Sequence, residues 1–282
     1  MKPVLEENDV AEILKIVEES DRPAEFVEAL AKGLAILECF DAAHPQMTLS
    51  EVARRVGLSP AAARRSLITL QTLGYVGQTN KHFHLRPKVM TLSSAFYFSA
   101  RIDEVLQPNL RMLVEQFGDA SSIGTLDGDH VIYVAHVSVQ RARRAAAVVG
   151  ARYPAGATSL GRVLLAGLSD EALEHYLKTA RLEALTSKTV TDPDVLREKI
   201  MAVRADGYAT TVDQLDYGIT ALAVPIRNFE GRTIAALNTS GYTGMATPES
   251  MIAERLPALR EAASHIAHAM SRYPVLQSTM GT

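Results

Sequence analysis

The sequence lacks several features that would place it in other protein classes. It has no tryptophan and a single cysteine, Cys39, so an intrachain disulfide is impossible and nothing indicates an oxidising compartment. No stretch reaches the roughly twenty apolar residues that span a bilayer. Neither G-x-G-x-x-G nor G-x-x-x-x-G-K-[ST] occurs, so we predict no cofactor. We expect a cytoplasmic protein without membrane attachment.

The chain also lacks the overall positive charge that many DNA-binding proteins carry, with 29 basic and 32 acidic residues. The acidic excess is concentrated in residues 1–25, which carry 3 basic and 8 acidic side chains. Residues 26–88 carry 8 basic and 4 acidic side chains, and they are the only basic segment. Such a segment is the electrostatic pattern of a module that meets phosphates. A net charge of +4 on residues 26–88 is modest for one DNA-binding module, so we expect the protein to bind DNA as a dimer.

A helix with clear start and stop signals is predicted over residues 49–56. Thr48 and Glu51 have the T-x-x-E spacing of a capping box, in which each side chain satisfies a free backbone N–H of the other residue. Gly57 follows, and glycine tolerates the left-handed conformation that commonly ends a helix.

A second helix is predicted directly after a short turn. Ser59 is suited to cap it, Pro60 fits its first position, and Gly74 ends it about four turns later. Its apolar stripe consists of Ala63, Leu67 and Leu70. Residues 75–78 and 82–85 then bracket Thr79-Asn80-Lys81 as a β-hairpin.

The helix before this unit, predicted over residues 26–41, is expected to close the core. Its apolar positions follow helical spacing and are Val27, Leu30, Leu34, Leu37 and Phe40. We expect Cys39 in the same helix to be a core residue. Two helices, a turn and a hairpin in this order predict a winged helix-turn-helix, which binds DNA, over residues 25–88.

The second helix has small side chains and arginines on the side away from the core, which suits the major groove. Expected base-facing residues are Ser59, Ala61, Ala62, Arg65 and Thr69. Expected phosphate-facing residues are Arg64 and Lys81, and Thr48 and His82 complete the predicted DNA-binding set. The alternative is an ordinary surface helix.

The rest of the chain alternates strands and helices, which predicts an α+β domain over residues 119–273. Residues 89–118 are expected to form a helical linker, with a helix over 103–117. Residues 1–24 are expected to be an extension with an amphipathic helix, and residues 274–282 a tail. A strong hairpin signal stands at Asp127-Gly128-Asp129, and short helices are predicted to begin at Ser159, Ser169 and Asp192. Pro257 is expected to kink or restart the last helix.

Four segments together resemble the IclR family of bacterial transcriptional regulators: FVEALAKGLAILECF, LSEVARRVGLSPAAARRSLITLQTLGYV, ATSLGRVLLAGLS and DYGITALAVPIRNFEGRTIAALNTSG. The resemblance implies a winged helix domain, a dimerising linker helix and a GAF-like or profilin-like effector domain, assembled as a homodimer or dimer of dimers. Within the family, VGARYPAGATSLG followed by RVLLAGL, and VDQLDYGITALAVPIR, look most similar to the branch that controls aromatic-acid catabolism through protocatechuate, 4-hydroxybenzoate and β-ketoadipate. Operator DNA and a small carboxylate are the implied partners.

The resemblance also implies an effector pocket around the predicted helix at residue 159. Its residues are Ser159, Leu160, Thr211, Asp213, Ala221 and Leu222. Free N–H groups and the positive dipole end of that helix suit a carboxylate. Arginines crowd a nearby loop and suit bidentate carboxylate binding, and these are Arg141, Arg143, Arg144 and Arg152. Ordinary core packing and a solvated loop are the alternatives.

Two other functions fit parts of the sequence. A small-molecule hydrolase with an accessory DNA-binding unit requires Ser159 as nucleophile with Asp213 and His265, but residues 153–156 are not expected to form the strand that must precede the serine. A constitutive DNA-binding protein would use its C-terminal domain only for assembly. The pairs His82/His84 and His265/His268 lack a third ligand at metal-site spacing, so we predict no metal. We also predict no catalytic residue.

Overall fold

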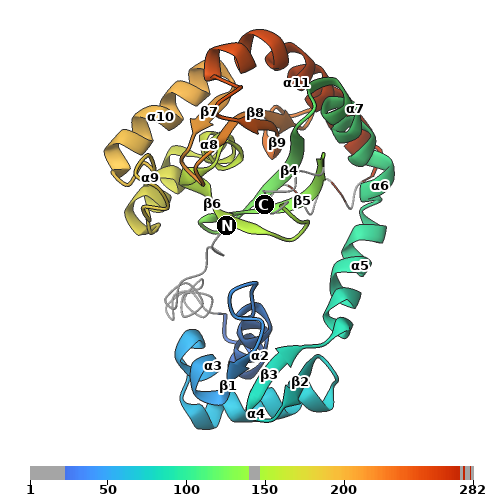
Figure 1. Ribbon diagram of the computed structural model, residues 1–282, viewed down its shortest axis with the longest axis vertical. Coiled ribbons are helices and arrows are strands. Elements are labelled where there is room, and N and C mark those ends of the chain that lie inside the picture. The colour runs from blue at the N-terminus through green and yellow to red at the C-terminus, as the bar shows by residue number, and fades with distance from the viewer. Residues whose placement is uncertain (1–22, 140–146, 274–275, 277–279, 281–282) are drawn as a thin grey trace. The chain divides into compact units, whose positions relative to one another are not determined.

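The computed structural model describes residues 23–139 and 147–273, together with Leu276 and Met280 (Figure 1). The chain divides into two compact units between Phe96 and Tyr97. None of the described helices is long and apolar enough to cross a membrane.

The described part of the first unit packs helices α2, α3 and α4 with a small antiparallel sheet of strand order β1-β3-β2. The helices are α2 (Glu28–Glu38), α3 (Leu49–Val56) and α4 (Pro60–Thr72), and the strands are β1 (Met47–Thr48), β2 (Val76–Thr79) and β3 (His82–Leu85). A 3-10 turn, η2 (Pro87–Val89), leads into α5 (Met90–Ser99), which runs across the boundary between the units. The fold is a winged helix-turn-helix, as the sequence predicts.

The caps of α3 and α4 form as the local sequence predicts. The Thr48 hydroxyl accepts a hydrogen bond from the Glu51 N–H, and the Glu51 carboxylate accepts one from the Thr48 N–H at 2.6 Å. The bonds that the Glu51 carboxylate accepts from the Thr48 N–H and hydroxyl hold the pKa of Glu51 below its usual value. Gly57 ends α3 in the left-handed conformation, and the Ser59 hydroxyl accepts from the Ala62 N–H at the start of α4.

Helix α2 packs with a different face from the one expected. Val27, Leu30 and Leu34 are 60%, 62% and 46% exposed, so they do not close the core of this unit. Its fully buried residues are Ala35, Ile36 and Cys39, while Leu37 and Phe40 pack at the core's edge. Two overlapping apolar stripes run along this helix, and packing against α3 and α4 selects the one with the smaller side chains.

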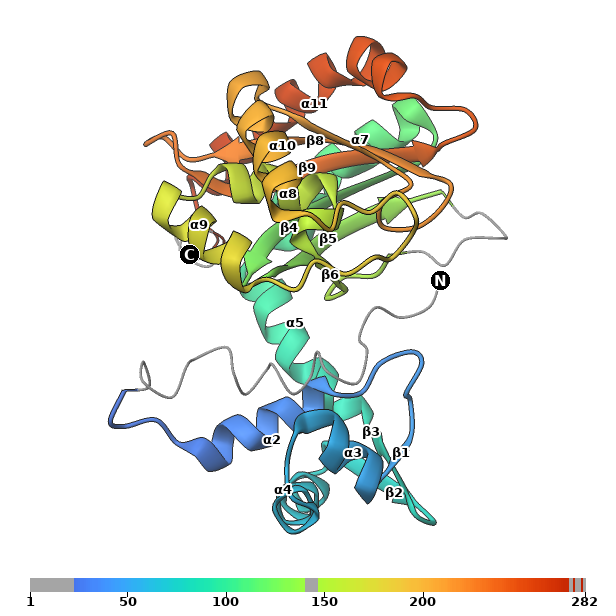
Figure 2. The same cartoon turned by 90° about the vertical axis from the view of Figure 1, so that its left-hand side faces the viewer.

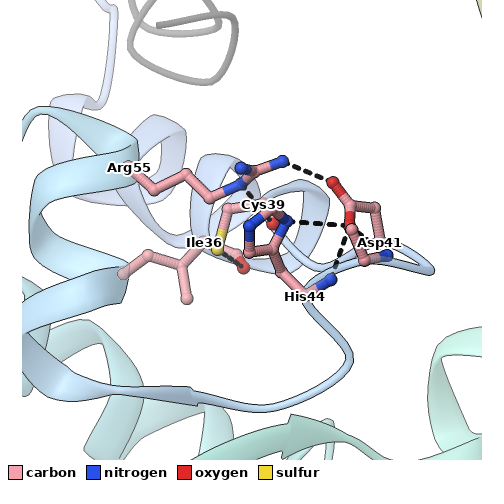
Figure 3. A network of polar contacts seen from close by, with 6 residues as sticks. Ile36, Cys39, Asp41, His44 and Arg55 are labelled. Carbon is pink, nitrogen blue, oxygen red and sulfur yellow. Dashed lines mark hydrogen bonds and ion pairs between the residues drawn. The ribbon is translucent and has the colours of Figure 1, made fainter. Parts of the chain in front are cut away.

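A buried arginine ties the end of α2 to α3 (Figure 3). Arg55 is 2% exposed, and its Nε donates to the Cys39 carbonyl at 2.9 Å while its Nη2 forms an ion pair with Asp41. The other carboxylate oxygen of Asp41 accepts from the His44 N–H at 2.8 Å and lies 3.1 Å from its ring nitrogen. The loop after α2 is therefore fixed by polar contacts to an arginine that is buried in the core.

The second unit is built on a six-stranded antiparallel sheet of order β6-β5-β4-β9-β8-β7. The strands are β4 (Ala120–Asp127), β5 (His130–Ser138), β6 (Arg152–Pro154), β7 (Ala209–Val212), β8 (Ile219–Arg227) and β9 (Thr233–Tyr242). The helices are α6 (Ile102–Val105), α7 (Gln107–Phe117), α8 (Ser159–Ala166), α9 (Asp170–Thr179), α10 (Pro193–Asp206) and α11 (Pro248–Met270), with a 3-10 turn η3 (Ala155–Ala157) before α8.

Helices cover both faces of this sheet (Figure 2). Helix α8 lies on one face, with α10 packed on α8 and α9 on α10, while α7 and α11 cover the other face. This is the α+β domain with an antiparallel sheet that the alternating sequence pattern predicts.

Three details differ from the sequence-based expectations. The helix expected over 103–117 is broken at Leu106 into α6 and α7, and α7 packs on β4 and β5. A short strand, β6, exists where residues 153–156 were not expected to form one. Helix α11 continues through Pro257 without restarting. The predicted N-terminal helix, Arg141, Arg143 and Arg144 lie outside the described residues.

Candidate DNA-binding and effector sites

The exposed side of α4 carries two arginines. Arg64 and Arg65 are exposed, as is Ala61 one turn earlier, whereas Ala62 is half-buried. The apolar stripe predicted for this helix, Ala63, Leu67 and Leu70, is buried. Packing of that stripe leaves the arginine side of α4 open to solvent, as a helix that enters a groove requires.

The wing lies beside the start of α3. Strand β1 pairs with β3 so that Thr48 lies opposite His82, and Lys81 is exposed at the tip next to Asn80, which has a left-handed backbone. Hydroxyls in the predicted DNA-binding set have bonds inside the protein: Thr48 and Ser59 cap helices, and Thr69 donates to the Arg65 carbonyl at 3.1 Å. The charged side chains are thus the groups most available to DNA.

In the second unit, α8 begins with a buried polar end. Thr158, not Ser159, is the cap: its hydroxyl accepts from the Gly161 N–H at 2.9 Å. Ser159 occupies the first helical position, is 1% exposed, and its Oγ has no hydrogen-bond partner among the described residues. Leaving a buried hydroxyl without a partner costs about 1–3 kcal/mol, so such a group marks a candidate site.

Strand register decides which expected pocket residues lie on the face of the sheet that α8 covers. Gly124 of β4 faces Leu160 of α8, since a Cβ there would lie 3.4 Å from the Leu160 Cδ1. Cross-strand pairing continues this face through Ala236 to Pro225 of β8. Because alternate residues share a face, Ala221 also faces α8. Its partner on β7, Thr211, does the same.

Two expected ligand residues lie on the other face of the sheet. Leu222 lies opposite Thr239, whose hydroxyl accepts from Arg255 of α11 at 3.1 Å. Arg152 pairs in register with Ile132, hence with the Thr125 side of β4, and forms an ion pair with Asp127 at 2.8 Å. One ligand held beside α8 does not reach this face, so Leu222 and Arg152 leave the candidate set.

Asp213 organises the loop after β7. It has a left-handed backbone with φ of 54°, and its Oδ1 accepts from the Gly218 N–H at 2.7 Å and from the Thr243 hydroxyl at 2.8 Å. Its carbonyl accepts from the Thr186 hydroxyl at 2.6 Å. These bonds assign the carboxylate to positioning this loop.

A charged group that the sequence-based set omits lies beside Ser159. Arg162 is 3% exposed; its Nε donates to the Gly156 carbonyl at 3.0 Å and its Nη2 donates to the Gln214 side-chain oxygen. Burial lowers the pKa of Arg162 to about 10, so the guanidinium stays charged at neutral pH. The signal for it is a single charged residue within the apolar run of SLGRVLLA.

Polar side chains on the α8 face of the sheet were also missed. The Asn238 Oδ1 accepts from the Ser122 N–H at 3.0 Å, and the Ser122 Oγ lies 2.9 Å from the His136 Nδ1. Ser122, Asn238 and Ala223 form one cross-strand row, which the register places on the α8 side. Polar residues at alternate positions of apolar strands were the available signal.

A small cavity of about 60 Å³ lies at the opposite end of α8, between Ala166, Gly167 and α10. Arg204 lines it, but its guanidinium is occupied by the Ala166 carbonyl at 3.0 Å, the Leu168 carbonyl at 2.7 Å and Asp170. Because these partners already occupy the Arg204 guanidinium, it has little capacity to bind a ligand in this cavity.

The hydrolase arrangement does not assemble. Ser159 starts α8, while His265 is exposed on α11, and these helices cover opposite faces of the sheet. The turn η3 separates β6 from the serine, so no strand leads directly into it. Among the described residues, no three His, Cys, Asp or Glu side chains gather in a way that would hold a metal ion.

Comparison with known proteins decides the family. Residues 29–80 match the IclR helix-turn-helix domain, and residues 96–268 match the bacterial transcriptional regulator IclR C-terminal domain. The chain belongs to the IclR family. It is a transcriptional regulator of that type, with a DNA-binding helix-turn-helix and an effector-binding domain.

Individual IclR-family relatives cover most of the chain. The Pca regulon regulatory protein of Pseudomonas putida is 36% identical over 86% of this chain and 84% of its own length. The p-hydroxybenzoate hydroxylase transcriptional activator of Acinetobacter baylyi is 36% identical, covering 88% and 93%. The solved structure of an IclR homolog complexed with 4-hydroxybenzoate from Microbacterium hydrocarbonoxydans is 26% identical, covers 86% and 99%, and superposes with a TM-score of 0.70.

Proposed function

We propose that this regulator senses a small aromatic carboxylate and controls genes for aromatic-acid catabolism. Supporting this are the two relatives named for the Pca regulon and for p-hydroxybenzoate hydroxylase, and the related structure that holds 4-hydroxybenzoate. The observation that carries the proposal is the buried Ser159 hydroxyl without a partner at the start of α8. Helix N-termini favour anions, and a buried serine adds a hydrogen-bond donor.

The proposed ligand site comprises Ser159, Leu160, Thr211 and Ala221, with Asp213 positioning the adjoining loop. Leu160 and Ala221 supply apolar surface for a ring, while the start of α8 supplies the polar end. Arg143 remains a proposed contributor from outside the described residues. The protein uses no cofactor, catalyses no reaction, and acts in the cytoplasm as a homodimer or dimer of dimers.

The proposed DNA contacts are those of α4 and the wing. Arg65 binds a base edge and Arg64 and Lys81 bind phosphates, with Ser59, Ala61, Ala62 and Thr69 beside the bases and Thr48 and His82 next to the wing. Small residues at the start of α4 allow close approach to the groove floor.

Mobility-shift binding to DNA upstream of its own gene and of neighbouring genes, at fixed salt, tests the proposal. We expect a specific shift that protocatechuate, 4-hydroxybenzoate or β-ketoadipate alters. The Ser159→Ala variant should bind the same DNA equally well but respond only at higher acid concentration. A specific shift that none of the acids changes contradicts the aromatic-acid assignment while leaving the regulator intact.

A further inference from the structure

The arginine at position 162 carries a charge that the described residues do not neutralise. Its guanidinium bonds the Gly156 carbonyl and the Gln214 amide oxygen, which are both neutral, and no described carboxylate lies within ion-pair distance. Buried charges in proteins are normally paired, because desolvating an unpaired ion is costly. Arg204 of α10, which bonds the Ala166 carbonyl at the other end of α8, does have a carboxylate partner in Asp170.

Further donors lie next to this guanidinium. Ser159 and Arg162 are three residues apart, so they lie on one side of α8, and a helical side chain points back toward the helix start. The bond from Arg162 to Gly156 shows this direction directly, because Gly156 precedes the helix. The guanidinium and the Ser159 hydroxyl therefore both lie toward the start of α8, where N–H groups other than that of Gly161, which Thr158 caps, lack intrahelical partners.

We propose that Arg162 is the counter-ion of the effector's carboxylate, and that the ligand takes the position at its guanidinium that the Gln214 side chain holds in the free protein. This inference rests on the proposed function, because it names the residue that recognises the acid. Guanidinium and carboxylate match as a bidentate pair, and hydrogen bonds between charged groups are about twice as strong as neutral ones. A carboxylate should therefore replace the neutral amide.

The exchange also provides a connection to the surrounding loops. The Gln214 carbonyl accepts from the Thr189 hydroxyl at 2.6 Å, and Asp213 next to it is held by Thr186. The Tyr217 hydroxyl accepts from the Ser187 N–H at 2.9 Å, so residues 186–189 and 213–217 form one bonded pair of loops. Releasing the Gln214 side chain removes the bond that ties this pair to α8.

Calorimetric titration of the full chain with 4-hydroxybenzoate, protocatechuate and the amide of each tests the inference. The wild type should bind an acid at least about 30-fold more tightly than its amide, which corresponds to about 2 kcal/mol. Arg162→Gln should lose that preference, whereas Arg162→Lys should keep part of it. Gln214→Glu should weaken acid binding about tenfold or more by placing a competing carboxylate on Arg162, and Gln214→Ala should not weaken it.

Arg204→Gln is the matched control, since it removes a largely buried arginine from the same region and should leave the acid-to-amide ratio unchanged. If Arg162 only braces the turn before α8, Arg162→Gln will lower the melting temperature while the ratio persists, and Gln214→Glu will bind acid normally. That result overturns the inference but leaves the aromatic-acid proposal standing. A wild type that binds none of these acids overturns both.

Discussion

Arg55 of α3 and Asp41 of the loop after α2 form an ion pair in which the arginine side chain is 2% exposed and the aspartate side chain 11% exposed. Arg55 also donates from its Nε to the Cys39 carbonyl at 2.9 Å, so it connects α3 to the end of α2 (Figure 3). Removing one member of a buried pair leaves the other charge uncompensated, which costs about 3–5 kcal/mol.

We therefore expect Arg55→Met to lower the free energy of unfolding of the first unit by about 3 kcal/mol or more. Its neighbour Arg54 is exposed, so Arg54→Met should change that free energy by no more than about 0.5 kcal/mol. Urea unfolding followed by circular dichroism measures both. Equal stability of the two variants would show that the Arg55–Asp41 ion pair does not stabilise the first unit.

Arg65 and Lys81 should affect operator binding in different ways. Arg65→Ala should cost about 1–3 kcal/mol on the operator and relax the preference at one base pair. Lys81→Ala should weaken binding to all sequences alike and lower the slope of log affinity against log salt by about 1. Lys32→Ala on α2 serves as control, because Lys32 pairs with Glu28 at 2.7 Å. Equal losses on specific and random DNA for Arg65→Ala contradict its assignment to a base.

Gly161 is required by the contact between α8 and the turn before it. A methyl group at this position would overlap the backbone of Ala155. Gly161→Ala should therefore destabilise the second unit by about 3 kcal/mol and abolish the response to acid. At Gly33 of α2 a methyl group meets nothing within 4 Å, so Gly33→Ala should stabilise the first unit by about 0.5–1 kcal/mol. Scanning calorimetry of the full chain separates the two effects; a loss on both substitutions would mean that helix propensity does not limit α2.

The Cys39 thiol should react only when the first unit unfolds. Burial raises the pKa of Cys39 from 9.0 to about 12, so the native protein holds almost no thiolate at pH 8. A chromogenic disulfide reagent should label it at the rate of unfolding in buffer and at once in denaturant. Fast labelling of the folded protein would contradict its burial.

The same shift makes stability fall in alkali. The unfolded thiol ionises at a lower pH than the folded one. The contribution of the protonated Cys39 thiol to folding stability is therefore complete below about pH 9 and is lost as the pH rises toward 12. At pH 10 the loss is on the order of 1 kcal/mol. Cys39→Ala should lack this part of the pH dependence. The measurement is the change in unfolding free energy between pH 8 and pH 10, which should be larger for the wild type than for Cys39→Ala. The same change in both proteins would contradict a raised pKa for Cys39.

Features encoded by neighbouring residues were predictable. The bounds of α3, the start of α4 and the wing hairpin follow from Thr48, Glu51, Ser59 and Pro60, whose capping and turn chemistry acts within about four residues. The IclR family was predictable from motifs that stand in the family's order, and its aromatic-acid branch from the likeness of the segments around Ser159 and Asp213.

Features set by distant contacts were not predictable. Strand β1 has two residues and exists only because Met47 pairs with Phe83. The buried face of α2 depends on which of two apolar stripes meets α3 and α4: the expected Leu37 and Phe40 do pack on the core, but Val27, Leu30 and Leu34 are exposed.

The effector site divides in the same way. The sequence by itself determined that a helix begins near residue 159, that strands follow it, and that the start of this helix suits an anion, because dipole and capping are local properties. Only the tertiary structure decided that Leu222 and Arg152 face away from α8 and that Arg162 is buried beside Ser159. The face of a strand and the desolvation of a charge are set by pairing and packing between segments far apart in the chain.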